Sequence, residues 1–273
     1  MSQNDGSGRW ISSNVSTSAG SRDFKLWIPR QCESQVPVAL LVLLHGCRQK
    51  VDNLALISGM NQVANEHGFL VVYPQQRRRA NLLRCWNWFE PRQQSRSGSE
   101  PSLLADITRE VTTTFNIDRR RAYAAGISAG GAMAVILAVT YPDVFSAIGL
   151  VAAVQYGAAS DASGGWKVMH HGGPDPSRQG LLAFQAMQAG LALRPCLRLP
   201  VICFHGDRDS AVASVNADQL IAQWAATNTL LSQTAGRNLS LSVRNTEDSS
   251  PGRDGYVRRQ YSDQAGRLLM EEW

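Results

Sequence analysis

The chain of 273 residues is 44% hydrophobic and 18% charged and carries a formal net charge of +5. That length suits one large domain with an ample core. Two arginine runs, at 77–79 and 119–121, hold much of the positive charge, but no nucleic-acid-binding motif accompanies them, so nucleic acid is not an expected partner. The longest apolar run, 38–44, is far short of a membrane span, so no membrane partner is expected either.

The N-terminal part is polar. Residues 1–21 are rich in Ser, Asn and Gly and are predicted to form a loose segment, with at most a short strand around Trp10 to Ser13. No signal peptide is visible there, because an apolar central region is lacking. The alternating residues 24–28, which end at Pro29, are typical of an early antiparallel strand.

From residue 38 onward, predicted strands and helices alternate. Continuous apolar runs predict strands that are buried on both faces, and helical patterns lie between them. We expect strands at 38–44, 69–73, 121–125, 147–151, 201–204, 255–261 and 267–273, and helices at 52–67, 102–115, 129–141, 180–191 and 215–226. This alternation, without repeats or a linker, implies a single doubly wound α/β domain over 22–273, with a mostly parallel sheet and helices on both faces.

Two long stretches interrupt the alternation. Residues 75–101 form a loop rich in Arg, Gln and Ser around the sequence CWNWF at 85–89, and a loop of this length with an aromatic cluster is expected to be functional. Residues 152–199 form a longer excursion, in the position where such folds place a lid or cap.

Residues 126–130 read Gly-Ile-Ser-Ala-Gly, the G-x-S-x-G pattern of a nucleophile elbow. A predicted strand precedes the pattern and an apolar, uncharged helix follows it, which favours an elbow over an incidental glycine-rich turn. Side chains at the two glycine positions would clash where strand and helix cross. We predict Ser128 as the nucleophile and the backbone N–H of Ala129 as one donor to an oxyanion.

An acyl-transfer serine also needs a base, a group that orients the base, and a second oxyanion donor. The strand at 201–204 leads into His-Gly-Asp-Arg-Asp, where Asp209 is favoured over Asp207 as the orienting acid; two solvated turn aspartates are the alternative. After the earlier buried strand, the N–H of Cys47 is the candidate second donor. His45 is expected to anchor that loop rather than to act as the base.

The base is the difficulty, because none of the five histidines follows Asp209. His205 is expected to pack or hydrogen-bond at its strand end. His170 and His171 precede two glycines and read as a helix end. The site could also be completed by a histidine from another subunit, or by His170 or His171 after a rearrangement.

The five cysteines show no metal-ligand spacing, and neither a metal nor an organic cofactor is implied. Their odd number leaves at least one free thiol. A Cys47–Cys85 bridge is compatible with the sequence, which does not by itself assign a redox compartment.

Beyond the elbow, the chain resembles the polyhydroxybutyrate (PHB) depolymerase family of α/β-hydrolase esterases, which also holds feruloyl and acetylxylan esterases. The matching motifs span nearly the whole chain: HGCRQ at 45–49, YPQQ at 73–76, CWNWF at 85–89, GSEP at 98–101, ID at 117–118, GISAGGAM at 126–133, YPDVF at 141–145 and HGDRD at 205–209. The resemblance implies an α/β-hydrolase fold, Ser128 as nucleophile, Asp209 as triad acid, and the amides of Cys47 and Ala129 as oxyanion donors.

The resemblance also implies an ester substrate: a short-chain hydroxyalkanoate polyester or oligomer, or a small acyl or aryl ester. Trp86 and Trp88 would supply an aromatic wall to the cleft, with core packing as the alternative for one of them. The family implies a secreted or periplasmic protein, although this sequence leaves a cytoplasmic location and a homodimer open.

The sequence departs from the family pattern at three places. In the family, a strand like 267–273 continues into a Gly-His-x-Trp-type segment that carries the catalytic histidine, which is not found here. Arg48 stands where threonine is frequent, and Ala-Val-Ala-Ser at 211–214 replaces the more usual Thr-Val-x-Pro. Two interpretations follow: a serine carboxylesterase that is active when complete, and a truncated or catalytically impaired homologue that binds esters or polymer.

Overall fold

The computed structural model describes residues 8–33, 36–193, 198–248 and 255–273. Within these ranges the strands are β1 (Gly8–Thr17), β2 (Gly20–Pro29), β3 (Val38–Leu44), β4 (Phe69–Pro74), β5 (Ile117–Ile127), β6 (Ile148–Val151), β7 (Val201–Phe204), β8 (Ser242–Asp248), β9 (Tyr256–Ser262) and β10 (Leu268–Glu272). The α-helices are α1 (Val51–Ser58), α2 (Met60–His67), α3 (Ser99–Thr114), α4 (Ala129–Thr140), α5 (Ala162–His171), α6 (Pro176–Leu193) and α7 (Val215–Thr234), with short 3-10 helices at Arg30–Glu33 and Pro91–Gln93.

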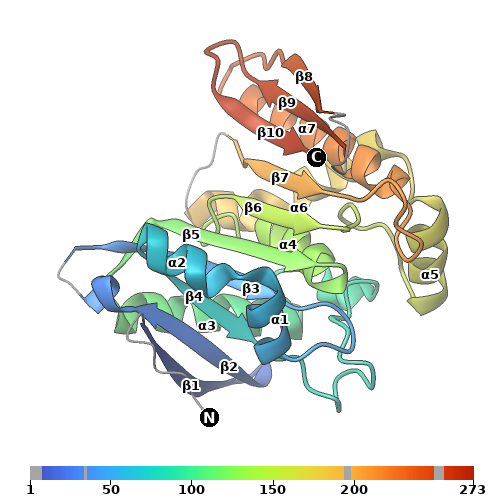
Figure 1. Ribbon diagram of the computed structural model, residues 1–273. Helices are drawn as coiled ribbons and strands as arrows, with labels where there is room; N and C mark the ends of the chain where they lie inside the picture. Colours follow the sequence, from blue (N-terminus) through green and yellow to red (C-terminus); the bar gives the residue numbers. More distant parts are fainter. Residues whose placement is uncertain (1–7, 34–35, 194–197, 249–254) are drawn as a thin grey trace.

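These strands form one sheet in the order β1-β2-β4-β3-β5-β6-β7-β10-β9-β8 (Figure 1). The central strands from β4 to β10 in this order run parallel, and antiparallel pairs β1–β2 and β8–β9 extend the two edges. The predicted class, one α/β domain with a mostly parallel sheet, is therefore confirmed.

Alternating side chains of the central strands fill two separate cores. In β3, Leu40, Val42 and Leu44 face the larger core, which α3, α4, α6 and α7 cover. Leu41 and Leu43 face a smaller core under α1 and α2. Figure 1 shows these two helix layers on opposite faces of the sheet. Burial on both faces explains why this strand reads as a continuous apolar run.

The N-terminal segment differs from its prediction. Residues 1–7 lie outside the described residues, but from Gly8 the chain forms β1, which pairs along its whole length with β2. The prediction that residues 1–21 are loose is therefore wrong from Gly8 onward. A polar sequence suits this edge strand, because backbone hydrogen bonds to one neighbour hold it while much of its surface is solvated.

Three other elements also differ from their predictions. The helix predicted at 52–67 is divided into α1 and α2 at Gly59, whose φ of 59° is left-handed and ends the first helix. The structure adds α5, a short helix rich in Gly and His, and β8, which is almost wholly exposed and so lacks an apolar pattern. Among the described residues, no helix has both the length and the apolar character to cross a membrane.

Candidate active site

The turn between β5 and α4 has the backbone strain of a nucleophile elbow. Ser128 occupies φ 54° and ψ −121°, a conformation that side chains other than glycine rarely adopt. A Cβ added at Gly126 would lie 2.3 Å from the carbonyl carbon of Gly130, and one added at Gly130 would lie 2.3 Å from the carbonyl oxygen of Leu44. Only glycine fits at either position, so the pattern that the sequence shows is a steric requirement here.

The helix that follows Ser128 is buried along its whole length. Its first residue, Ala129, has a backbone N–H with no hydrogen-bond partner among the described residues. The first N–H groups of a helix have no acceptor inside it and carry partial positive charge. The helix therefore presents a donor beside the Ser128 hydroxyl, which itself has no hydrogen-bond partner in the described part of the chain.

A second loop approaches the elbow from the end of β3. A Cβ added at Gly46 would lie 3.6 Å from the Cβ of Ser128, so this loop passes directly beside the serine. The N–H of the next residue, Cys47, has no hydrogen-bond partner among the described residues. The two amides predicted as oxyanion donors thus lie on loops that meet at Ser128.

His45 anchors the loop, as the sequence predicted. Its fully buried ring places Nδ1 2.7 Å from the carbonyl oxygen of Gly46, and Nε2 accepts a hydrogen bond of 3.0 Å from the backbone N–H of Gln76. Burial lowers the pKa of His45, which favours the neutral ring. A neutral imidazole with Nδ1 donating and Nε2 accepting satisfies both contacts.

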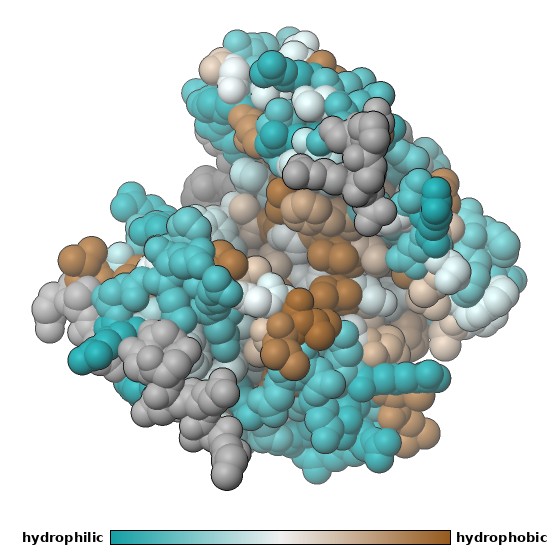
Figure 2. Space-filling model, viewed as in Figure 1, coloured by the Kyte–Doolittle hydropathy of each residue, from teal (hydrophilic) through white to brown (hydrophobic). Residues whose placement is uncertain are grey.

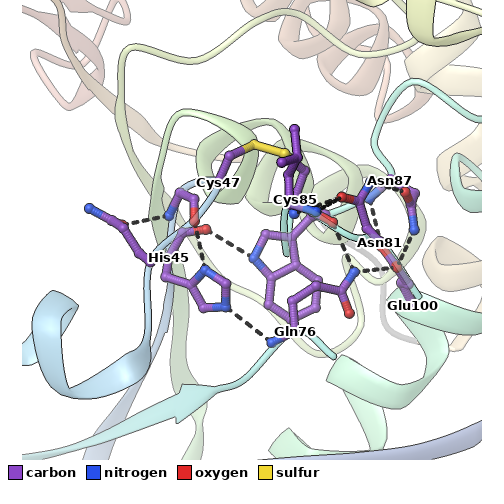
Figure 3. Close-up of a disulfide and its surroundings, with 11 residues drawn as sticks. His45, Cys47, Gln76, Asn81, Cys85, Asn87 and Glu100 are labelled. Carbon is purple, nitrogen blue, oxygen red and sulfur yellow. Dashed lines mark hydrogen bonds between the residues drawn. A yellow bond between two sulfur atoms is a disulfide. The ribbon is translucent and has the colours of Figure 1, made fainter. Parts of the chain in front are cut away.

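A buried polar network lies behind this loop (Figure 3). The Glu100 carboxylate accepts hydrogen bonds from the side chain of Gln76 at 2.5 Å and from the side chain and backbone N–H of Asn87 at 2.7 and 2.8 Å. Desolvation by burial raises the pKa of Glu100 despite these donors. A disulfide joins Cys47 to Cys85, so the bridge that the sequence allowed is confirmed and ties the loop to this network.

The two tryptophans of the 75–101 loop have different positions. Trp86 is fully buried and its Nε1 donates a hydrogen bond of 3.0 Å to the carbonyl oxygen of His45. Trp86 therefore follows the core-packing alternative that the sequence left open for one of the two tryptophans, and it does not line the pocket at Ser128. Trp88 lies beside Ser128 and lines a small pocket there.

A small apolar pocket opens at the nucleophile. Its volume is about 10 Å³, and it is lined by Trp88, Ser128, Ala129, Ala132, Ala152, Val154, Met169 and Val212. Met169 comes from α5, which packs on the aromatic loop: a Cβ added at Gly165 would lie 3.3 Å from the Trp88 ring. Sequence reasoning missed Met169. The signal that could have found α5 is Asp161, whose side chain accepts from the N–H of Gly164 at 2.7 Å and caps the helix.

The loop after β7 carries the two candidate acids. Asp209 accepts hydrogen bonds from the backbone N–H groups of Ala211 at 2.8 Å and Val212 at 2.9 Å through one carboxylate oxygen. Val212 in turn lines the pocket at Ser128. Asp207 is exposed and has no hydrogen-bond partner among the described residues. Asp209, rather than Asp207, therefore shapes the loop that reaches the pocket.

None of the five histidines, all of which are described, donates to or accepts from the Ser128 hydroxyl. The Nε2 of His205 lies 2.8 Å from the carbonyl oxygen of Val212 and 3.8 Å from an Asp209 oxygen, while its Nδ1 is buried without a partner. His170 and His171 end α5, as the sequence predicted for this pair, and the His170 ring stacks on Trp166.

Comparisons with known proteins identify the family of the chain. A family model described as Esterase PHB depolymerase matches residues 23–247. The chain is 28% identical over 262 residues, 96% of its length, to poly(3-hydroxyalkanoate) depolymerase C of Paucimonas lemoignei. It is 26% identical over 234 residues, 82% of its length, to an acetylxylan esterase of Coprinopsis cinerea. The chain spans only 58% and 57% of these two relatives.

Among solved structures, an acetyl xylan esterase from Aspergillus awamori superimposes with a TM-score of 0.74 at 17% identity, covering 96% of this chain and 92% of that one. A ferulic acid esterase superimposes with a TM-score of 0.53 at 17% identity over 84% of this chain and 86% of that chain. These likenesses confirm the predicted α/β-hydrolase fold.

Proposed function

We propose that this chain, which belongs to the Esterase PHB depolymerase family, is a serine carboxylic-ester hydrolase that works through an acyl-enzyme on Ser128. The observation that carries the proposal is the strained backbone of Ser128, with two unpaired amide donors beside it. Strain of this kind persists only where the surrounding packing holds it in place. The family, the relatives and the structural neighbours are esterases or depolymerases, so a purely binding homologue is not favoured.

In the proposed mechanism, the Ser128 oxygen attacks the ester carbonyl carbon while a histidine takes the hydroxyl proton. The N–H groups of Cys47 and Ala129 stabilise the oxyanion, and the histidine returns the proton to the leaving alcohol. Water then attacks the acyl-enzyme with the same histidine as base and releases the acid. Asp209 orients the imidazole and stabilises its charged form.

The mechanism requires an imidazole that the arrangement around Ser128 does not supply from the chain's five histidines. Only one carboxylate oxygen of Asp209 is available to such an imidazole. The first oxygen accepts hydrogen bonds from two backbone N–H groups, and the second, available one lies 3.8 Å from the Nε2 of His205. We propose that a histidine reaches the space between this second oxygen and the Ser128 hydroxyl in the active protein.

The substrate is proposed as an ester with a short acyl group. The pocket at Ser128 is small and lined by apolar side chains, which supports a short apolar acyl group over a long one. A polyester remains the alternative substrate class. It is supported by the exposed apolar residues Val151 and Phe204 at the ends of β6 and β7. Figure 2 shows hydrophobic residues gathered across the middle of the face that it draws.

The compartment is proposed to be oxidising, either extracellular or periplasmic. The Cys47–Cys85 disulfide supports this, because such bonds persist outside the reducing cytosol. A homodimer also stays a proposal, and sedimentation of the purified chain over a range of concentrations tests it.

Hydrolysis of p-nitrophenyl acetate and butyrate by the chain and by its Ser128→Ala variant tests the proposed function. The expected result is turnover that needs Ser128 and that rises when imidazole is added to supply the base. The Ser128→Ala variant in the same imidazole solution corrects for hydrolysis by imidazole alone. Catalysis without a triad base still exceeds the water reaction by roughly 10³–10⁴-fold in a serine protease. Equal rates for both proteins, with and without imidazole, would falsify the proposed nucleophile.

A further inference from the structure

A second cavity, distinct from the pocket at Ser128, lies behind the oxyanion loop. Its volume is about 340 Å³, and no residue that lines it also lines the pocket at Ser128. The turn between β1 and β2, the segment after β4 and the start of α3 enclose it. Most of the lining is polar or charged: Ser21, Arg22, Arg77, Arg79, Asn87, Arg92, Gln93, Ser99 and Glu100.

Arginine is concentrated in this lining. The lining holds four arginines and one carboxylate, that of Glu100, which already accepts three hydrogen bonds from Gln76 and Asn87. Arg77 is paired with Asp23 at 3.0 Å, and Arg92 with Glu90 at 2.6 Å. Two of the four cations are therefore already neutralised by acids next to the cavity.

The other two arginines have no ion pair among the described residues. Arg79 is exposed and has no hydrogen-bond partner there. Arg22 is only 4% exposed, its Nη1 donates to the Gln76 side chain, and its Nε is a buried donor without a partner. A buried charged donor that lacks an acceptor costs free energy comparable to a lost charged hydrogen bond. An acceptor from outside the protein, placed in the cavity, removes that cost.

We propose that this cavity binds a small oxyanion, of the phosphate or carboxylate type, between Arg22 and Arg79. Guanidinium groups offer pairs of parallel N–H donors that match two oxygens of such an anion. The run of arginines at 77–79 is therefore not merely a solvated surface, since Arg77 and Arg79 line the site and Arg78 does not.

The site also lies next to the catalytic loop. Arg22 donates to the side chain of Gln76, whose backbone N–H donates to the ring of His45. An anion bound to Arg22 is therefore connected, through Gln76, to His45, which anchors the predicted oxyanion loop. Anion binding at this site is independent of the proposed ester hydrolysis, and it can be measured without an ester substrate.

Titration calorimetry of the purified chain with inorganic phosphate, and separately with malonate, tests the proposal at constant ionic strength set with sodium chloride. Saturable binding of at least one of the two anions is expected. Tighter binding of phosphate assigns the phosphate class, and tighter binding of malonate assigns the carboxylate class. Failure of both anions to saturate the protein would overturn the proposal.

Two single variants separate a site from general attraction of anions to a basic surface. Arg79→Ala should weaken binding by about tenfold or more, because it removes one charged hydrogen-bonding partner. Arg78→Ala removes the same charge from a neighbouring position outside the lining and should leave the dissociation constant unchanged. Equal weakening in both variants means that only surface charge attracts the anion. Arg22→Lys, with its melting temperature measured alongside, should also weaken binding because lysine lacks the planar fork.

Discussion

The Nδ1 atom of His45 lies 2.7 Å from the carbonyl oxygen of Gly46. That carbonyl and the N–H of Cys47 belong to one planar trans peptide, so they point in opposite directions. Because the His45 ring holds the Gly46 carbonyl on its own side, the Cys47 N–H points away from the ring and is available to another acceptor. A buried histidine that takes no part in proton transfer can thus position an oxyanion donor.

The first prediction concerns the pH dependence of stability through His45. Because burial lowers the pKa of His45 in the folded state, the unfolded chain binds more protons below its ordinary pKa of about 6.5. Its contribution to stability is therefore full above about pH 6.5 and falls on acidification, by up to about 1.4 kcal/mol per pH unit. Urea unfolding between pH 5 and 7 measures this slope. The slope should be smaller in His45→Gln, and His67→Gln, which removes an exposed ring, is the control.

The second prediction concerns the elbow glycines. Gly130→Ala should destabilise the protein by about 3 kcal/mol or more, because the new methyl group meets the Leu44 carbonyl oxygen at 2.3 Å and backbone atoms must move. Gly164→Ala in α5 is the matched control, since its nearest atom is 3.5 Å away. That substitution should be neutral or stabilising by up to about 1 kcal/mol, as expected for Gly to Ala in a helix. Thermal unfolding of both variants decides the matter, and equal melting temperatures would contradict the steric explanation.

The third prediction concerns the disulfide. Reduction of the Cys47–Cys85 bond, which closes a separation of 38 residues, should cost about 4 kcal/mol of unfolding free energy. The variant in which both cysteines are Ser should start at this lower stability and should not respond further to dithiothreitol. Cys32→Ser keeps the bridge and should respond like the original chain. Guanidinium unfolding with and without reductant provides the measurement, and a double variant that still responds to reductant would assign the effect elsewhere.

The fourth prediction concerns acyl-chain length. Met169→Ala should enlarge the apolar pocket at Ser128 and raise the ratio of kcat/KM for p-nitrophenyl butyrate over acetate by about tenfold, since one or two methylene groups are worth that much in a fitted pocket. Leu181→Ala, which shortens an exposed side chain on α6, should leave the ratio unchanged. If both variants keep the original ratio, the acyl group does not occupy this pocket.

The fifth prediction concerns the histidine pair at the end of α5. Turnover that depends on Ser128 should be the same in the original chain and in the variant with His170→Ala and His171→Ala. The reason is that the His170 ring is stacked on Trp166 at 4.3 Å between ring centres and its Nδ1 contacts the Trp166 carbonyl oxygen. A drop in kcat at constant KM would instead identify one of the pair as the recruited base.

The sequence determined the elements whose cause is local. The glycines around Ser128 mark the elbow because strand, turn and helix are consecutive in the chain, and their crossing leaves no room for a Cβ. The buried central strands were predicted for the same kind of reason, since a parallel strand covered on both faces must be apolar throughout. The helix end at His171 also followed from neighbouring residues, because Gly172 closes it.

The side of a loop on which each side chain lies follows from contacts that form only in the folded chain. Trp86 and Trp88 are two residues apart, yet one is buried against His45 and the other lines the pocket. Met169 reaches the same pocket from α5, of which the sequence indicated only the C-terminal end. Arg22 and Arg79 line one cavity although 57 positions separate them. These side-chain positions depend on contacts between segments that are distant in the chain. The identity of a single residue does not predict such contacts, because they form only when the sheet assembles.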